Sequence, residues 1–307
     1  MLAIIGIVVV FGAVIGGYLL EKGVLAVLMQ PAELLIIGGA ATGTLLIANP
    51  LHIIKAVLNG VGGAFKGSQY TTQRYLESLK MLFELFNRAR REGLAAVESD
   101  VEEPAKSKCF NAFPTLLKDH HLMDFVCDTL RTAASGAVDP FDLDQMMETD
   151  TDVHHHDSAE PIAALSTVAD ALPGLGIVAA VLGVVVTMGA LGGPPEEIGH
   201  KVAAALVGTF LGILLCYGLV GPLAGSMAKN ADAEHAYYLV LRIAIAAFIK
   251  GTSPILAVEL GRRAIPGPVR PKFQELEKTC RKKATAPAAS EASAAAATPS
   301  APAAPAA

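Results

Sequence analysis

Four long stretches of the sequence contain no aspartate, glutamate, lysine or arginine. They have 20 to 27 residues each and occupy positions 1–20, 34–54, 171–195 and 202–228. Charged residues make up 17% of the whole chain, so a uniform distribution would place several charges in each stretch. About 20 apolar residues are enough to cross the core of a bilayer as a helix. The sequence therefore predicts a membrane protein with four spanning helices rather than a soluble or secreted globular domain.

The first stretch also has the apolar character of a secretory signal peptide. Such a peptide needs a basic segment before the apolar run and small residues at a cleavage site after it. Neither occurs before Glu21 and Lys22. We therefore expect the first stretch to be retained as a membrane anchor.

The positions of lysine and arginine predict how the four spans are oriented. Lys22 is the only basic residue between the first two spans, and Lys201 is the only one between the last two. The other 22 of the 24 lie in the middle segment or after the fourth span. Loops rich in lysine and arginine stay in the cytoplasm. We expect both termini and the middle segment in the cytoplasm, with the two short loops outside.

The expected fold class is an all-α membrane protein: four transmembrane helices, a large helical cytoplasmic loop between spans two and three, and a helical cytoplasmic C-terminal region. The expected boundaries are 1–20, 32–54, 171–193 and 202–225 for the spans, 55–170 for the loop, 226–283 for the helical tail and 284–307 for a final segment. That final segment consists of alanine, proline, serine and threonine with one glutamate. Because such a composition cannot bury a core, we expect it to be disordered.

The middle segment carries the clearest helical pattern. Over 73–91, apolar residues recur every three or four positions and charged residues take the other face, as in an amphipathic helix. Gly93 is the expected C-cap. Further helices are expected at 121–134, 139–146, 231–250 and 254–263. The acidic run 148–157 is expected to link the helix at 139–146 to span three.

The charge-free stretches contain no candidate ion carrier. An ionisable side chain inside the membrane is the usual mark of an ion or proton pathway. The nearest one, Glu33, lies at the edge of span two and is expected at the membrane interface. If the protein moves ions, the titrating group must therefore come from a partner.

Two prolines lie in the last two spans. Proline removes a backbone donor and can kink a membrane helix. Pro173 lies near the start of span three, where a first-turn proline is ordinary, and Pro222 lies near the end of span four, where it can terminate a helix. The residues alone favour these structural roles for both prolines.

Motifs for catalysis or metal binding are absent. Segment 60–66 has Phe65 where a phosphate-binding loop needs its second glycine, and no serine or threonine follows Lys66. Three consecutive histidines at 154–156 do not converge on one helix face, so a solvated loop is favoured over a metal site. We expect no enzyme activity, no cofactor or metal, and no nucleic-acid partner.

Three blocks of sequence resemble the MotA family of flagellar stator subunits, part of the MotA/TolQ/ExbB superfamily. They read QPAEL at 30–34, LPGLGIVAAV at 172–181 and VGTFLGILL at 207–215. The first is preceded by Gly16-Gly17-Tyr18, and matching positions continue after the fourth span through Arg270-Pro271. The resemblance runs in order from residue 1 to about 283 and excludes the final segment.

The resemblance implies a ring of five MotA-like chains around two MotB-like chains in the bacterial inner membrane. In this family the one-span MotB-like partner supplies the ion-binding aspartate, which agrees with the missing carboxylate noted above. Ion passage turns the ring, and its cytoplasmic segment pushes on the rotor protein FliG. The functional prolines of the family match Pro173 and Pro222, so the resemblance overrides the structural roles given above.

The resemblance also indicates which charges face the rotor. The torque-generating charges of the family match Arg90 and Glu98. From the residues alone these would be a solvated pair of little energetic value. A shift in register would instead give the role of Arg90 to Arg91 or Arg88.

The ion is expected to be a proton. Sodium-driven relatives carry a threonine at the position that matches Ala180, whereas Thr209 has a hydroxyl counterpart in both kinds. A methyl group at Ala180 gives a sodium ion one ligand fewer, while a proton needs no coordination shell. Together with Pro173 and Pro222, these two residues form the expected ion pathway.

Two other functions compete with a motor subunit. An ExbB/TolQ-type subunit would also surround a partner helix but would energise envelope transport. Such relatives typically have three spans, so the four charge-free stretches count against that function. A self-contained channel or transporter is disfavoured by the uncharged spans.

Overall fold

A computed structural model describes residues 2–189 and 192–281, and the regular elements within these ranges are all helices. Four of them are long and apolar enough to cross a membrane: Leu2–Leu20, Leu25–Ala48, Pro140–Met188 and Pro195–Ile249. This confirms the all-helical fold and the four apolar helices expected as membrane spans. The expected disordered segment 284–307 lies outside the described residues.

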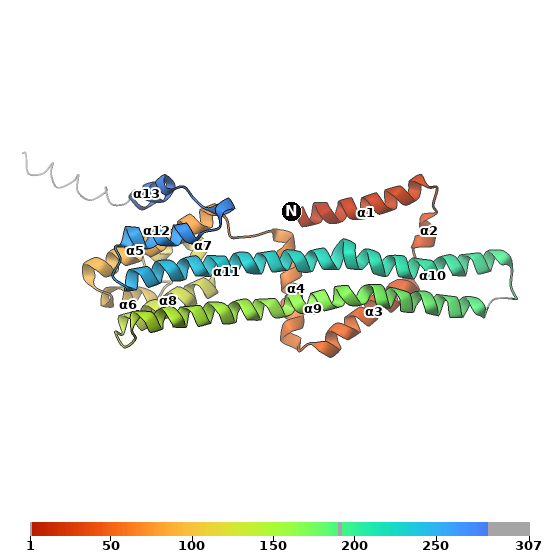
Figure 1. Cartoon of the computed structure of the whole chain (residues 1–307), viewed down its shortest axis with the longest axis horizontal. Coiled ribbons are helices and arrows are strands. Elements are labelled where there is room, and N and C mark those ends of the chain that lie inside the picture. Colours follow the sequence, from red (N-terminus) through yellow and green to blue (C-terminus); the bar gives the residue numbers. More distant parts are fainter. Residues whose placement is uncertain (1, 190–191, 282–307) are drawn as a thin grey trace, which may run out of the picture. The chain divides into compact units, whose positions relative to one another are not determined.

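The structure consists of two units. Unit 1 comprises Met1–Gln69 and Asp152–His235, and unit 2 comprises Tyr70–Thr151 and Ala236–Ala307. Helices α9 (Pro140–Met188) and α11 (Gly221–Ile249) each contribute residues to both units (Figure 1).

Unit 1 contains the apolar helices. Besides its parts of α9 and α11, they are α1 (Leu2–Leu20), α2 (Leu25–Leu28), α3 (Pro31–Ala48), α4 (Leu51–Lys66), α10 (Pro195–Leu215) and the π-helical turn η2 (Cys216–Val220). Helix α1 is apolar on every side and has no buried residue. A helix of that kind needs an apolar surrounding, such as lipid or other membrane helices.

The second span ends six residues before the end of the expected range 32–54, because α3 ends at Ala48. Pro50 has no backbone N–H and disfavours helical backbone at the residue before it. A separate amphipathic helix, α4, then begins at Leu51 and buries Ile53 and Val57 among residues of α9 and α11.

Unit 2 is a bundle of shorter amphipathic helices around the end of α11. Its elements are α5 (Thr72–Glu92), α6 (Ala95–Glu102), η1 (Phe110–Ala112), α7 (Pro114–Leu117), α8 (His120–Ala134), α12 (Pro254–Ala264), η3 (Gly267–Val269) and α13 (Phe273–Arg281). The helices expected at 73–91 and 121–134 are therefore confirmed. Gly93 ends α5 with a φ of 91°, which a residue with a side chain rarely adopts.

The acidic run 148–157 was expected to link two helices, but α9 continues through it without a break. The run contains neither glycine nor proline, so no residue in it stops a helix. The prediction of a solvated loop at the three histidines is also wrong, because they lie in α9. His154 places Nε2 3.4 Å from Oε1 of Glu234 on α11, and the His155 and His235 rings lie 4.5 Å apart.

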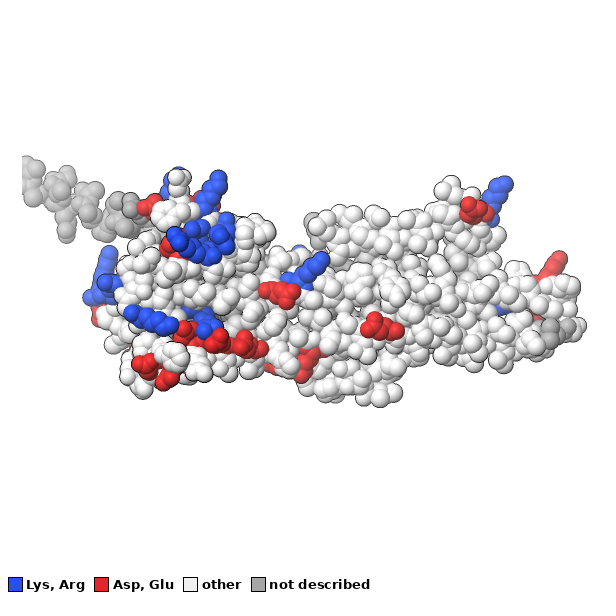
Figure 2. Space-filling view, in the orientation of Figure 1, with Lys and Arg blue, Asp and Glu red and all other residues white. Residues whose placement is uncertain are grey.

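Charged side chains are unevenly distributed over the face drawn in Figure 2. Most of them lie over elements of unit 2, whereas those over unit 1 are fewer and scattered. Several large apolar side chains of α9 are exposed, among them Ile177, Val181 and Val185. Exposed apolar faces of this size require lipid or other helices to cover them.

Candidate functional site

Helices α9 and α10 cross at glycines that bring their backbones almost into contact. A Cβ atom at Gly212 would lie 2.6 Å from the carbonyl oxygen of Leu172 and 2.9 Å from the Cα of Gly176. No side chain fits in that space. Small residues permit this close approach, which is how helices associate in lipid.

Pro173 lies beside this crossing and deep inside α9. The role of a first-turn proline is therefore wrong for this residue. Because Pro173 has no N–H, the carbonyl of Ala169 loses its ordinary helical donor. The backbone hydrogen bonding of α9 is consequently weakened next to its close contact with α10.

Pro222 also lies within a continuous helix, so its role as a helix terminator is wrong. It follows the π-helical turn η2, where the N–H of Gly221 donates to the carbonyl of Cys216. A Cβ at Gly221 would lie 2.9 Å from that same oxygen, so this turn suits glycine. Pro222 itself is exposed. Wide turns of this kind interrupt the regular hydrogen-bond ladder and are frequent at functional sites.

The structure brings Ala180 and Thr209 to neighbouring turns of α9 and α10. A Cβ at Gly208 would lie 3.3 Å from the backbone nitrogen of Ala180, and one at Gly176 would lie 3.4 Å from the Cα of Thr209. Both residues are half-buried. In the part of the chain that the structure describes, the Thr209 hydroxyl makes no hydrogen bond. It is therefore available to a ligand or a partner.

Glu33 belongs to the same place, although the sequence predicted an interfacial position for it. The residue is only 6% exposed, and its Oε2 would lie 2.6 Å from a Cβ at Gly208. That oxygen has no hydrogen-bond partner in the described residues. The missing side chain at Gly208 makes the space that the carboxylate occupies. This pairing could not be inferred from the sequence, because α3 and α10 are far apart along the chain.

The two charges expected at the rotor lie in unit 2. Arg90 is in the last turn of α5 and Glu98 is in the first turn of α6, and both side chains are exposed. Within residues 2–189 and 192–281 neither of them forms an ion pair.

Arg88 has a different environment, which bears on the choice among the three arginines. It forms ion pairs with Asp100, which is only 5% exposed, and with Glu92. The pair with Asp100 holds α6 against the end of α5. Arg90 and Arg91 remain exposed. Arg88 thus has a structural role, whereas Arg90 and Arg91 form no ion pair with any residue that the structure describes.

Comparisons with known proteins identify the family. Residues 4–93 match the family model "Motility protein A N-terminal", and residues 118–238 match "MotA/TolQ/ExbB proton channel family". Motility protein A of Escherichia coli K12 is 38% identical over 281 residues, covering 92% of this chain and 95% of that protein. The chain belongs to the MotA family.

Other relatives agree with this membership. The chemotaxis protein LafT of Vibrio parahaemolyticus is 36% identical and covers 89% of this chain and 96% of its own length. The flagellar MotAB stator complex of Bacillus subtilis has a chain with a TM-score of 0.68, 26% identity, and coverage of 84% of this chain and 92% of that one. The MotAB structure of C. jejuni has a TM-score of 0.71 at 21% identity, covering 86% and 95%, and supports the same fold.

Membership in the MotA family confirms the resemblance drawn from the three sequence blocks. It identifies the chain as a multi-pass membrane protein of a family of motility proteins and proton channels, which is not a family of enzymes. Among the described residues, no group of three or more histidines, cysteines or acids is arranged to hold a metal ion.

Proposed function

We propose that this chain is the stator subunit of a bacterial flagellar motor and converts ion flow into torque. It pairs with a MotB-like one-span protein that carries the ion-binding aspartate, and five copies surround two such partners in the inner membrane. Both termini face the cytoplasm, where unit 2 pushes on the rotor protein FliG. The observation that carries this proposal is the 38% identity to E. coli motility protein A across 95% of that protein.

The ion pathway runs along the crossing of α9 and α10 in this proposal. Pro173, Ala180 and Thr209 lie at that crossing, and Pro222 lies in α11, just after the π-helical turn that follows α10. The missing N–H of each proline lets the helix backbone bend without breaking an existing hydrogen bond. Glu33 adds a carboxylate beside Gly208. These features support a helix pair that changes shape as a partner's aspartate gains and loses an ion.

The transported ion is a proton in this proposal, because Ala180 offers no oxygen ligand beside Thr209. We expect swimming speed to be unchanged when sodium in the medium is replaced by potassium at constant ionic strength. The measurement is the mean speed of cells tracked under the microscope, with pH held constant. A speed that rises and falls with sodium concentration would contradict the role of Ala180.

The rotor interface consists of Arg90 and Glu98, which are exposed and form no ion pair within residues 2–189 and 192–281. We expect the double reversal Arg90→Glu with Glu98→Lys to abolish or strongly slow swimming. The reason is that both charges act on a partner surface, while neither side chain forms an ion pair with another residue that the structure describes. The measurement is swimming speed together with the amount of protein in the membrane fraction, which should stay at the wild-type level.

A matched control separates the rotor role from a change in surface charge. Lys108 and Glu102 are exposed residues of the same unit, and Lys108→Glu with Glu102→Lys leaves the net charge unchanged, as the Arg90/Glu98 reversal does. This control should leave swimming unchanged. Unimpaired swimming of the Arg90/Glu98 variant would remove these residues from the interface. If Arg90→Glu alone swam normally and Arg91→Glu alone did not, the rotor role would belong to Arg91.

The alternative of an ExbB/TolQ-type subunit has weaker support. The match over residues 118–238 is to a model shared by all three groups. The match over residues 4–93, however, is to the N-terminal part of motility protein A. That segment contains the first two membrane-span candidates, apart from the first two residues of α1, and all of α4 and α5. It therefore favours the motor over envelope transport.

A further inference from the structure

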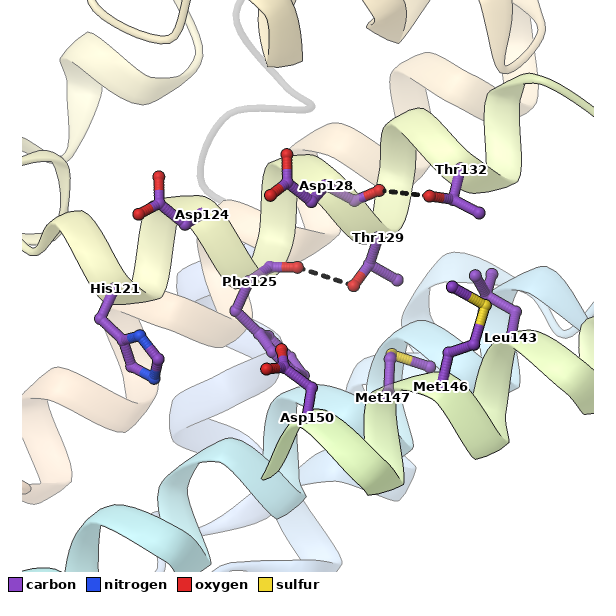
Figure 3. A pocket seen from close by; sticks show the side chains of 10 residues that line it. All are labelled: His121, Asp124, Phe125, Asp128, Thr129, Thr132, Leu143, Met146, Met147 and Asp150. Carbon is purple, nitrogen blue, oxygen red and sulfur yellow. Dashed lines mark hydrogen bonds between the residues drawn. The ribbon is translucent and has the colours of Figure 1, made fainter. Parts of the chain in front are cut away.

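A groove of about 290 Å³ lies in unit 2 between α8 and the start of α9 (Figure 3). Its floor is formed by Phe125, Thr129, Leu143 and Met147, which are buried, and by the exposed Met146. The Thr129 hydroxyl donates to the carbonyl of Phe125 at 2.7 Å, so it offers no donor to a ligand. The floor therefore suits apolar side chains, and methionines adapt their shape to them.

The rim of the groove is acidic. Asp124 and Asp128 on α8 point away from the floor, and Asp150 stands on α9 (Figure 3). Asp128 pairs with its helix neighbour Arg131, but in the described residues no ion pair forms to Asp124 or Asp150. No lysine or arginine lines the groove. An occupant with an apolar body and a positive charge at its edge would be complementary.

Helix α12 of the same unit has a face with that chemistry. Leu256, Leu260 and Arg263 follow the i, i+4, i+7 spacing of one helix face and are 51%, 39% and 73% exposed. Arg263 uses its Nε to donate to Glu259. No other hydrogen bond to its guanidinium occurs in the described part of the chain. The face is thus apolar, uncovered and positive at its C-terminal end.

One copy of the chain cannot place its own α12 in its own groove. Gly261 of α12 packs against Val240 and Ala244 of α11, whereas Tyr238 of α11 packs against Phe125 of α8. Residues two positions apart on a helix point about 200° apart, so Tyr238 and Val240 lie on opposite faces of α11. Helix α12 and the groove therefore lie on opposite sides of α11.

We propose that the α12 face of one copy of this chain docks into the α8–α9 groove of the next copy. Leu256 and Leu260 contact the methionine floor, and Arg263 faces the carboxylates of the rim. Two different surfaces meet in this contact, so successive copies are joined head to tail. Such copies close into a ring when the rotation that relates each copy to the next divides a full turn. The inference deepens the proposed stator function and rests on its assembly from several copies.

Disulfide cross-linking in native membranes tests the contact. In a chain whose four cysteines are replaced by alanine, Met146→Cys and Leu260→Cys are introduced together, and oxidation is followed by gel electrophoresis. We expect cross-linked dimers and higher multiples. Each single-cysteine variant should give almost none, because in a head-to-tail contact neither residue meets its own copy.

Charge reversal at the rim provides a matched pair of variants. Asp150→Lys in the double-cysteine chain should lose most of the cross-linked product, because it would face Arg263. Asp142→Lys should retain the product, because Asp142 is equally exposed on α9 but does not line the groove.

Three results would overturn the docking contact. They are equal cross-linking by a single-cysteine variant, no multimers from the double variant, and capture of a different protein at Met146→Cys. Swimming of the cysteine-free parent is measured separately. If that parent swims but the double-cysteine chain gives no cross-linked product, the contact fails while the stator function stands. Paralysed cells in which the double-cysteine chain still cross-links would mean that the contact stands and the stator function fails.

Discussion

Gly212→Ala is expected to remove most of the folded protein from the membrane. The added Cβ would lie 2.6 Å from the Leu172 carbonyl oxygen and 2.9 Å from the Gly176 Cα, so backbone rather than a flexible side chain would have to move. Overpacking a tight contact costs about 3 kcal/mol, which is a large part of the stability of an ordinary domain. The measurements are the protein level in the membrane fraction and the thermal midpoint of the detergent-purified chain.

Gly174→Ala is the matched control for this substitution. Gly174 is also a helical glycine next to Pro173, but no atom lies within 4 Å of the position that its Cβ would take. Alanine there should leave the protein level unchanged, because it improves helix propensity. If Gly212→Ala behaved like Gly174→Ala, the close crossing of α9 and α10 would be wrong.

Glu259→Gln is expected to destabilise unit 2 by about 3 kcal/mol, the cost of leaving a buried charge without its partner. Both carboxylate oxygens of the buried Glu259 accept hydrogen bonds from Arg262 at 2.7 Å. Arg262 also donates to the carbonyl of Pro271, at 3.0 Å. The substitution therefore releases both α12 and the segment that leads to α13. Faster hydrogen exchange of residues 254–271 measures this loss.

The same pair makes the stability of unit 2 dependent on pH. Hydrogen bonds from Arg262, and then from Arg263, lower the pKa of Glu259 although burial opposes them. A group whose pKa is lower in the folded state stabilises the fold above its unfolded pKa of about 4.3 and loses that contribution as pH falls further. We expect the protection of residues 254–271 against hydrogen exchange, corrected for the intrinsic rate at each pH, to fall below about pH 4.3 in the wild type but much less in Glu259→Gln.

Arg263→Gln is the control for the ion pair between Glu259 and Arg262. Its side chain is 73% exposed and donates only one bond to Glu259, so its loss should cost less than about 1 kcal/mol. An effect as large as that of Glu259→Gln would mean that the exposed pair, and not the buried one, holds α12.

The spans and the main amphipathic helices could be predicted because their causes are local. Absence of charge over some 20 residues predicts a membrane helix, and the period of apolar residues over 73–91 predicts α5. The proline at position 50 is also a local signal, but the expected span ran past it. The absence of glycine and proline from the acidic run 148–157 is a local signal for a continuous α9, but the contacts of two of its histidines with Glu234 and His235 of α11 join distant segments.

The less predictable parts of the candidate site depend on contacts between distant segments. Glu33 is buried because Gly208 has no side chain, and the pattern around Glu33 gives no sign of that neighbour. The π-helical turn depends on one shifted hydrogen bond at Gly221. The structural role of Arg88 depends on its ion pair with Asp100, which lies on the short helix α6 that packs against α5. The prolines, by contrast, were recognised through the family resemblance and not through their local pattern.

The most direct test of the stator function is the rotation of tethered cells from which the gene for this chain has been deleted. We predict flagella that are assembled but paralysed, with rotation restored by the wild-type chain and not by the Arg90→Glu, Glu98→Lys variant. Cells that lack the chain and still rotate at the wild-type speed would contradict the account.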